Sequence, residues 1–467
     1  MTELLNIIIN KPNWEQKIRD QQIVTKWKDE IGKQYSSKSS SILVDLIIDL
    51  LKQYKKGEYD EDDDYPWVMN LDLNPNDFGI NEECKCPCAV CTESEYLLHS
   101  DYEDEDEDEE QTIANEALRQ LECQCLKETI KIKKQNFLLS HINFTSNLIT
   151  DELKQKFKTQ IDNFSKTIPI DYHPGSNGQI VDLVHPSMYC YVKGVTSTKV
   201  AMDPNILFQW LPAEFKVTPE RVTIESDIDN LDREQNPELY SSIAEIFKLF
   251  VPRFEYVLHK LFEERRIKLY QLENCQVIVK LANAVLTPNS PTSPEGSWHL
   301  EGLPHEKIVA TGIYYYEMSN IRENYLNFRG TIPASYKLSY PQNATKYVET
   351  HYDLHSSDDD HEYSTIVDLG RIETKEDICL VFPNFLQHRV SDLSLIDPTK
   401  PGCRKILVFF LIDPSSRILS TRDVEPQQSK MSFEDAQYYR ELLMFQRKYE
   451  ISEQQTFYER GWSLCEH

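Results

Sequence analysis

Apolar residues in the first half of the chain recur with the period of an α-helix. The clearest stretch is 236–266, where Ile243 and Phe247 share one face with their apolar neighbours. Pro237 fits the first turn of that helix, where proline is tolerated. Residues 41–54, SILVDLIIDLLKQY, have the same spacing after a run of serines that can cap a helix. The pattern therefore predicts a mainly helical N-terminal half.

The pattern changes between residues 267 and 413 to short β-branched or aromatic stretches separated by turn residues. Such a series is typical of two packed sheets or a jelly roll. After it, residues 432–450 again have a helical pattern, with Ser432 as cap and acids in the first turn. The eight candidate strands are IKLYQL (267–272), QVIVKLANAVL (276–286), SWHLEG (297–302), IVATGIYYY (308–316), STIVDLG (364–370), ICLVFP (378–383), HRVSDL (388–393) and RKILVFFLID (404–413).

Charge changes this picture between residues 58 and 110. The chain of 467 residues has a net charge of −27, and two runs concentrate it: six acids at 58–64 and nine at 101–110. We expect a disordered, solvated insertion there, with a moderately acidic folded part around it. This balance argues against nucleic acid as a partner, because phosphate contacts need Lys and Arg. The alternative use of the acid runs is to hold a basic protein partner.

The same composition bears on the compartment. The longest apolar runs, such as ILVFFLI (406–412), are too short to cross a bilayer. The N-terminus lacks a basic segment and a cleavage site, so we expect an intracellular protein, cytoplasmic or nuclear, with no membrane partner. Disulfides are then not expected among the eleven cysteines.

Candidate chemistry begins with the segment GSWHLEG. Alternate residues of a strand point to the same face, so His299 and Glu301 would project together. With His388, which follows an apolar strand, they make a set of two histidines and one carboxylate that suits non-heme Fe(II). An H-x-(D/E) pair is common by chance, and it also occurs at His99 and His351. Only the pair at His299 is flanked by apolar strands on both sides.

Arg404 opens the last apolar strand, RKILVFFLID, where its side chain would be partly buried. A buried guanidinium needs an anion, and its fork suits a carboxylate. Two interpretations remain open: a structural salt bridge with one of the many acids, or an anchor for a dicarboxylate that chelates iron at its other end.

The order H-x-(D/E), H, R over a series of strands resembles the Fe(II)/2-oxoglutarate-dependent dioxygenase superfamily. The segments SWHLEG, EKIVATGIYYYEMSNI, FPNFLQHRV and DPTKPGCRKILVFFLIDP are similar to a fungal family known only as a domain of unknown function. NKPNWEQKI near the start and VDLVHPSMYCYVKG (181–194) extend the resemblance over most of the chain.

The resemblance implies iron ligands at His299, Glu301 and His388, and 2-oxoglutarate bound by Arg404. It implies a hydroxylase as the default activity, with a substrate that the sequence does not identify. Glutamate replaces the superfamily's commoner aspartate at 301. Other branches use lysine for the cosubstrate, so Lys405 competes with Arg404, and strand alternation lets only one of the two point inward.

Three further residues are candidates for supporting roles around the site. Asn384 and Gln387 are possible hydrogen-bonding partners of the ligands, and Tyr315 is a possible pocket residue, although packing explains each of them as well. Two rival functions stay open. One is a cupin-like metalloenzyme without 2-oxoglutarate, for which His305 is the nearest extra ligand. The other is a non-catalytic interaction protein that uses its acidic segment.

The remaining candidates are cysteines and isolated histidines. Cys84, Cys86, Cys88 and Cys91 offer a weak zinc site or reduced thiols in a loop. We interpret His185 as structural.

Together these patterns predict an α+β fold: a C-terminal double-stranded β-helix, or jelly roll, flanked by a mainly helical N-terminal half and a C-terminal helix. The predicted divisions are an N-terminal helical segment (1–57), the acidic and Cys-rich insertion (58–110), a helical support region (111–265), the jelly-roll catalytic domain (266–425) and a C-terminal helical segment (426–467).

Overall fold

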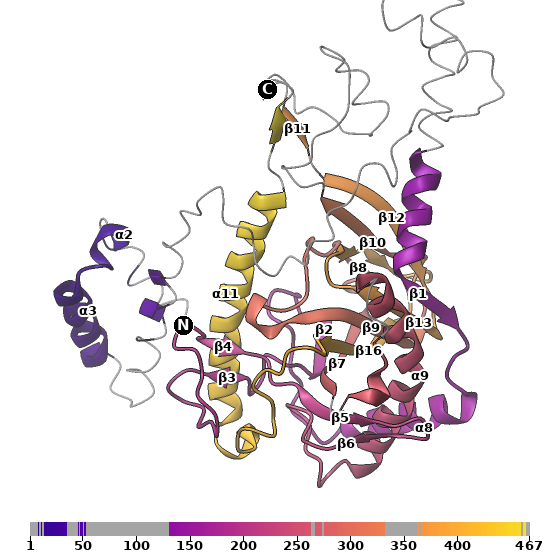
Figure 1. The fold of residues 1–467 in the computed structure, drawn as a ribbon, viewed down its shortest axis with the longest axis horizontal. Helices are drawn as coiled ribbons and strands as arrows, with labels where there is room; N and C mark the ends of the chain where they lie inside the picture. The colour runs from indigo at the N-terminus through magenta and orange to yellow at the C-terminus, as the bar shows by residue number, and fades with distance from the viewer. Residues whose placement is uncertain are drawn as a thin grey trace, which may run out of the picture.

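The computed structural model of the chain places helices and strands over most of its length (Figure 1). The predicted insertion at 58–110, with its four clustered cysteines, lies outside the described residues. The structure describes residues 14–34, 130–262, 267–272, 275–331 and 366–458, with the short pieces 8, 11, 45, 47–49, 51–52, 362–364 and 461–463.

Helices and short strands share the chain before residue 274, and after it most elements are strands. Residues 130–141 form a further helical segment before β1. In chain order the elements are α2 (Trp14–Lys17), α3 (Gln21–Gln34), β1 (Asn143–Ser146), α8 (Asp151–Phe164), β2 (Ile180–Val184), β3 (Tyr191–Val192), β4 (Phe208–Gln209), β5 (Ala213–Val217), β6 (Val222–Ile224), α9 (Pro237–Leu261), the 3-10 turn η1 (Leu269–Gln271), β7 (Cys275–Leu286), β8 (Thr292–Ser293), the 3-10 turn η2 (Pro304–Glu306), β9 (Ile308–Ser319), β10 (Asn324–Thr331), β11 (Glu362–Ser364), β12 (Ile366–Thr374), β13 (Ile378–Pro383), β14 (Gln387–Val390), β15 (Leu393–Ser394), β16 (Gly402–Ile412), the 3-10 turn η3 (Gln427–Ser429), α11 (Phe433–Tyr458) and β17 (Gly461–Ser463).

Two antiparallel sheets form the centre of the molecule. The large sheet has eight strands in the order β1-β13-β9-β16-β7-β5-β6, with β2 also paired to β7, and the small sheet has the order β12-β10-β14. Ile313 and Tyr315 of β9 belong to the same apolar cluster as Phe328 of β10, so the two sheets pack face to face. The alternate residues Tyr314 and Tyr316 belong to a second cluster with α8 and α9. Burial on both faces explains why β9 is apolar almost throughout.

Most successive strands of the core cross from one sheet to the other. β7 lies in the large sheet, and the next segment brings His299 into a backbone bridge with His388 of β14, at the edge of the small sheet. The chain then passes through β9 in the large sheet, β10 and β12 in the small sheet, β13 in the large, β14 in the small and β16 in the large. This connectivity places side chains from distant parts of the sequence inside one two-sheet core.

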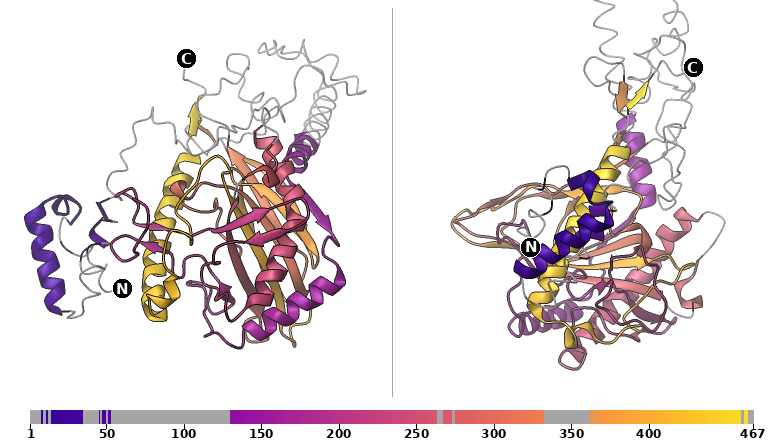
Figure 2. Two further views of the ribbon diagram at one scale, coloured as in Figure 1. Left: turned by 60° about the horizontal axis from the view of Figure 1, so that its bottom comes forward. Right: turned by 90° about the vertical axis from the view of Figure 1, so that its left-hand side faces the viewer.

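Helices cover the outside of this core. α9 packs on β13, β9 and β6, and α11 stands on the opposite side of the molecule from α8 and α9 (Figures 1 and 2). Gly312 allows the close approach of α9, because a Cβ at that position would lie 2.8 Å from Phe254 Cζ. The cap predicted for α11 is present: the backbone N–H of Asp435 donates to Ser432 Oγ at 3.1 Å.

Three local predictions were wrong. The region 111–265 was predicted to be helical, but its described part also contains six short strands, of which β1, β2, β5 and β6 extend the large sheet. They complete the edges of β13 and β7, and strands this short have no readable period. Residues 267–272 hold the 3-10 turn η1 instead of a strand. SWHLEG (297–302) makes one bridge, at His299, and then bends.

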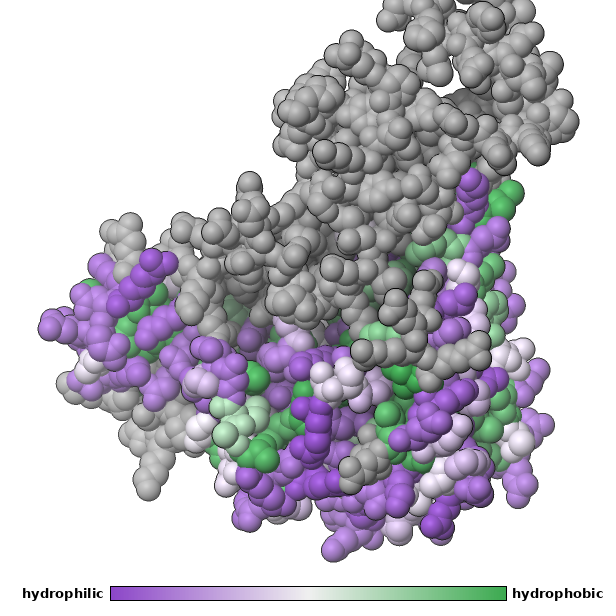
Figure 3. All heavy atoms as spheres, viewed as in Figure 1, coloured by the Kyte–Doolittle hydropathy of each residue, from purple (hydrophilic) through white to green (hydrophobic). Residues whose placement is uncertain are grey.

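The surface in Figure 3 is mostly hydrophilic, with apolar residues scattered among charged ones over the described part of that face. Among the described residues, no helix has both the length and the apolar character needed to span a bilayer.

Candidate metal centre

His299 and His388 meet where the segment after β8 runs beside β14. Each backbone N–H donates to the carbonyl of the other residue, at 3.2 Å and 3.1 Å. The antiparallel bridge places the two rings on one face, with centroids 4.4 Å apart. Phe382 lies against His388, with ring centroids 4.7 Å apart, so this face belongs to the apolar core between the sheets.

Glu301 completes the group. Its Oε1 lies 3.3 Å from His388 Nε2 and 3.8 Å from His299 Nε2. Its backbone is held by Asn384, whose Oδ1 accepts from the N–H of Glu301 and whose Nδ2 donates to the carbonyl of Glu301, both at 2.9 Å. The same Nδ2 donates to the carbonyl of Ile308 at 2.9 Å. The bend after His299 is therefore fixed by one amide side chain.

The donor atoms of these three residues suit one metal ion. One ligand atom from each residue lies within 4.8 Å of the others. Ligands bound side by side about 2.1 Å from one ion are roughly 3 Å apart, so small side-chain rotations suffice. His299 Nδ1 lies 2.8 Å from the carbonyl of Ser297, a contact that places its proton on Nδ1 and leaves Nε2 as the free lone pair. His388 Nδ1 has a longer contact of the same kind, 3.4 Å to the carbonyl of Leu386.

The charges in this group oppose and balance one another. Burial favours the protonated form of Glu301, but hydrogen bonds and charges from both histidines outweigh it and hold the pKa of Glu301 well below its usual range. Burial and the nearby His299 lower the pKa of His388. Burial also acts to lower the pKa of His299, but its contact with Glu301 raises it overall. The carboxylate is thus the ionised member, as a metal ligand must be.

Arg404 lies inside the same core. Strand β16 points it inward, it is 7% exposed, and its Nη1 donates to Asn324 Oδ1 at 2.6 Å. The predicted alternative of a structural salt bridge is not observed with any carboxylate of the described residues, and Nε has no hydrogen-bond partner there. Burial lowers the pKa of Arg404, as expected for a cation taken from water without a counter-ion. A buried guanidinium in this state is a candidate anion site.

Lys405 points the other way. Its Nζ lies 3.1 Å from Glu317 and 3.8 Å from Asp162 of α8, on the outer face of the large sheet. Among the two candidates for a cosubstrate carboxylate, the structure therefore directs Arg404 inward and Lys405 outward.

Of the other predicted residues, some lie beside the candidate ligands or Arg404 and some lie apart from them. Asn384 contacts the backbone of Glu301, as described above. Tyr315 is 2% exposed on the inner face, and its hydroxyl pKa is raised by burial, while Arg404 acts to lower it. Gln387 was predicted wrongly: strand alternation turns it away from His388, and its Oε1 accepts from Arg329 Nε at 2.7 Å. His305 lies apart from the group, with Nε2 2.8 Å from the carbonyl of Phe208.

Asn324, the hydrogen-bond partner of Arg404, was not among the predicted site residues. Asn324 is fully buried at the start of β10, and its Oδ1 also accepts from Thr374 Oγ1 at 2.9 Å. No motif marks this asparagine, because its role depends on β10 facing β16 across the core.

Comparison with known proteins gives a family and several distant structures. The model of a family described as "Protein of unknown function (DUF4246)" matches residues 118–274 and 262–435. No curated protein matches the chain significantly. A solved Fe(II)/α-ketoglutarate-dependent dioxygenase, TqaL, is 12% identical, with 62% of this chain and 87% of that chain covered and a TM-score of 0.30.

Two prolyl hydroxylases are also among the similar structures. The Pseudomonas putida prolyl-4-hydroxylase is 7% identical over 58% of this chain and 92% of that chain, with a TM-score of 0.27. A Trichoplax adhaerens prolyl hydroxylase, solved with a hypoxia inducible factor peptide fragment, is 10% identical over 67% and 96%, with a TM-score of 0.25. Resemblances this distant assign no function, which has to come from the residues themselves.

Proposed function

The chain belongs to the DUF4246 family, and we propose that this member is an Fe(II)- and 2-oxoglutarate-dependent oxygenase that hydroxylates an organic substrate. The observation that carries the proposal is the meeting of His299, Glu301 and His388, from two distant segments, around a point where one metal ion fits.

The connectivity of the strands supports a double-stranded β-helix as the scaffold. Eight segments are distributed over two facing antiparallel sheets, and all successive ones except β10 and β12 change sheet, in the manner of a jelly roll. In that arrangement the segment bearing His299 and the strand bearing His388 are neighbours, although β9, β10, β12 and β13 separate them along the chain. The fold thus accounts for why a histidine pair so far apart in sequence shares one face.

His299, Glu301 and His388 would hold the iron through two imidazole nitrogens and one carboxylate oxygen. When bound, Fe(II) supplies the activation of oxygen that is coupled to decarboxylation of 2-oxoglutarate to succinate. The chain supplies the rest. Asn384 fixes the backbone of Glu301, the carbonyl of Ser297 orients His299, and Phe382 keeps the inner side of His388 apolar.

Arg404 is proposed to bind the distal carboxylate of 2-oxoglutarate. A bidentate pair with that carboxylate would satisfy the guanidinium that no described acid pairs, and Asn324 already holds one of its nitrogens in place. The apolar inner faces of β9 and β16 exclude water around this pair, which strengthens it.

Release of succinate tests the proposal directly. Purified protein with Fe(II), ascorbate and 2-oxoglutarate should release succinate slowly without substrate, and His299→Ala and His388→Ala should both abolish the release. His305→Gln is the matched control: it removes an imidazole outside the group, while the new amide can still donate to the carbonyl of Phe208. Circular dichroism establishes that each variant is folded. Turnover that survives both alanine substitutions, or no iron-dependent succinate from the unaltered protein, would reject the assignment.

A further inference from the structure

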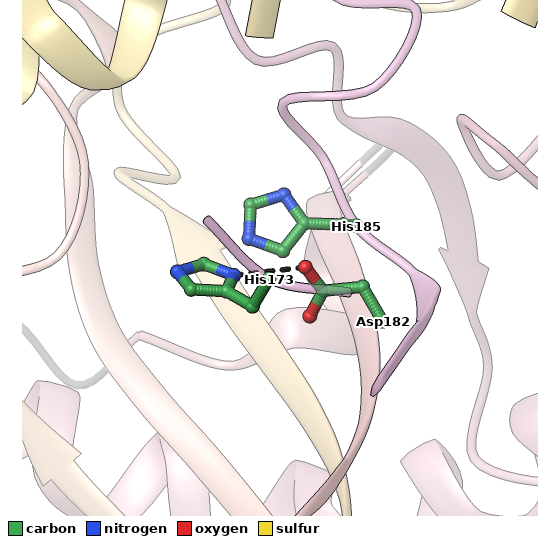
Figure 4. Close-up of side chains that lie close together, drawn as sticks. All are labelled: His173, Asp182 and His185. Atoms are coloured by element: carbon green, nitrogen blue, oxygen red, sulfur yellow. Dashed lines mark hydrogen bonds and ion pairs between the residues drawn. The ribbon is translucent and has the colours of Figure 1, made fainter. Parts of the chain in front are cut away.

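A second group of two histidines and one carboxylate lies outside the proposed iron centre. His173, Asp182 and His185 each offer one ligand atom within 4.8 Å of the others. Asp182 is in β2, His185 follows directly after it, and His173 is on the preceding loop. Figure 4 shows the carboxylate of Asp182 and a ring nitrogen of His185 both directed toward His173.

Backbone hydrogen bonds hold this group before any ion arrives. The N–H of His173 donates to the carbonyl of Ile180, and the N–H of Asp182 donates to the carbonyl of Asp171, both at 2.9 Å. The two segments form a narrow hairpin closed by the turn at 174–179. The positions of His173 and Asp182 are therefore fixed relative to each other, as a preorganised site requires.

Asp182 has an unused acceptor. Its side chain is 0% exposed, and Oδ2 lies 2.8 Å from His173 Nδ1. Its Oδ1 has no hydrogen-bond partner among the described residues. The nearest cation, Arg440, is 4.0 Å from Oδ2 and is already bonded to Asp171 at 2.5 Å. Buried carboxylates are normally paired or bound to a metal, and the one side-chain hydrogen bond of this carboxylate among the described residues is with His173.

Metal binding at His185 would cost one hydrogen bond. It is 3% exposed, and the N–H of Ser187 donates to its Nδ1 at 3.1 Å, which leaves the ring proton on Nε2 in the empty group. Coordination through Nε2 would move that proton to Nδ1 and break the contact with Ser187. Only an ion with strong affinity for imidazole nitrogen can offset the loss of this hydrogen bond.

We propose that His173, Asp182 and His185 form a second metal site that takes a divalent transition ion of the Zn²⁺ type. Two imidazoles and one carboxylate are a common zinc set, with a fourth position open to water. A cleft of about 180 Å³ lies beside the group, with Asp171 and Asp182 in its lining. Bound there, the ion stabilises the folded chain because the unfolded chain cannot reproduce the site.

Cobalt binding tests this site apart from the iron centre. The test protein carries His388→Ala, and Cys84, Cys86, Cys88 and Cys91 are replaced by serine, so that neither the iron centre nor these thiols bind the probe. Titration with Co²⁺ alone should produce the visible absorption of a low-coordinate cobalt ion at one ion per chain, and Zn²⁺ should displace it. His173→Gln should weaken the affinity for Co²⁺ by at least about 100-fold. Loss of a residue that only hydrogen-bonds to a metal ligand lowers affinity by about 10–100-fold, and loss of a ligand itself should cost at least as much.

The control is His305→Gln in the same background, which should bind Co²⁺ unchanged. His173 is partly exposed, so its replacement should fold, and a thermal melt checks this. If the background folds poorly, the unaltered chain is titrated instead, and His173→Gln should lower the number of Co²⁺ ions bound by one. Equal cobalt binding with and without His173 would overturn the proposal, as would no increase in the melting temperature of the unaltered protein with Zn²⁺.

Discussion

The two histidine–carboxylate–histidine groups of this chain use the same side chains in different ways. The group at His173, Asp182 and His185 is local: one hairpin and the residues after it supply every member. The group at His299, Glu301 and His388 is assembled by the fold, from segments that meet only when the small sheet forms.

Their charges differ as well. Asp182 has an arginine within 4.0 Å and one imidazole at 2.8 Å. Glu301 has two imidazoles at 3.3 Å and 3.8 Å and no arginine or lysine of the described residues within ion-pair distance. The proposed iron group also shares its core with Arg404, the proposed anion site. Ligand identity alone therefore does not distinguish the proposed catalytic group from the proposed stabilising one, whereas the neighbouring cation and the surrounding core do.

The sharpest test of this comparison converts each carboxylate to its amide. Glu301→Gln keeps the shape but removes the anionic ligand, so iron-dependent succinate release should fall at least about 100-fold. In the test protein that carries His388→Ala and the four serine replacements, Asp182→Asn should instead abolish the rise in melting temperature with Zn²⁺. Glu295→Gln is the matched control, an exposed acid nearby that pairs with Arg389. Equal loss of succinate release in the Glu301→Gln and Asp182→Asn variants of the otherwise unaltered chain would end the distinction between the groups.

Arg404 tests whether the anion site belongs to the iron group. Arg404→Leu should raise the KM for 2-oxoglutarate about 10–100-fold, because a charge-assisted pair is lost. Its melting temperature without cosubstrate should not fall, since an unpaired buried cation is removed. Lys405→Met is the control and should leave the KM unchanged, because Lys405 pairs with Glu317 on the outer face. A rise in KM with Lys405→Met, and none with Arg404→Leu, would reverse the assignment.

Short-range patterns predicted the parts of the molecule that depend on short-range physics. The helix at 237–261 and the Ser432 cap follow from apolar period and from polar side chains near helix ends. Alternation correctly left one of Arg404 and Lys405 pointing inward, but only the pairing of β16 with β7 and β9 shows which one.

The residues that were predicted wrongly or not at all depend mostly on long-range contacts. Gln387 faces outward because β14 pairs with β10 in one register, and no local pattern specifies that register. Asn324 matters only because it lies across the core from Arg404. The group at His173 had a signal that was overlooked: HPGSNG contains Gly175 and Gly178, both at positive φ, in a turn that brings His173 back beside β2.

Asn384 allows a sharper comparison of how the two groups are held. Asn384→Ala removes three hydrogen bonds to backbone groups of Glu301 and Ile308, so the free energy of unfolding should fall by about 2 kcal/mol. The Fe(II) concentration for half-maximal succinate release should rise as well, because Glu301 loses its fixed backbone. Urea titration measures the first effect and turnover the second.

The matched control for Asn384 is Asn327→Ala, since Asn327 has only a 3.5 Å contact with the carbonyl of Arg389. The hairpin at His173 is held by its own backbone groups and by Ser176, whose Oγ donates to the carbonyl of His173 at 2.7 Å, so this support comes from within the hairpin. Unchanged iron dependence in Asn384→Ala would show that the bend holds Glu301 without help.

The smallest expected effect concerns pH, and it uses a histidine outside both groups. Burial lowers the pKa of His305, as it lowers the pKa values of His185 and His388, so each folded site resists protonation. Below the unfolded pKa of about 6.5 the unfolded chain binds more protons, so the free energy of unfolding falls as pH drops through that value. Above pH 7 this contribution is complete. With a chelator present, urea unfolding at several pH values should give a slope that His305→Gln reduces by at most about 1.4 kcal/mol per pH unit. An identical slope in the variant and the unaltered chain would mean that His305 is protonated as easily in the folded chain as in the unfolded one. The slope below pH 6.5 would then come from other titrating groups, first of all the two metal-free clusters.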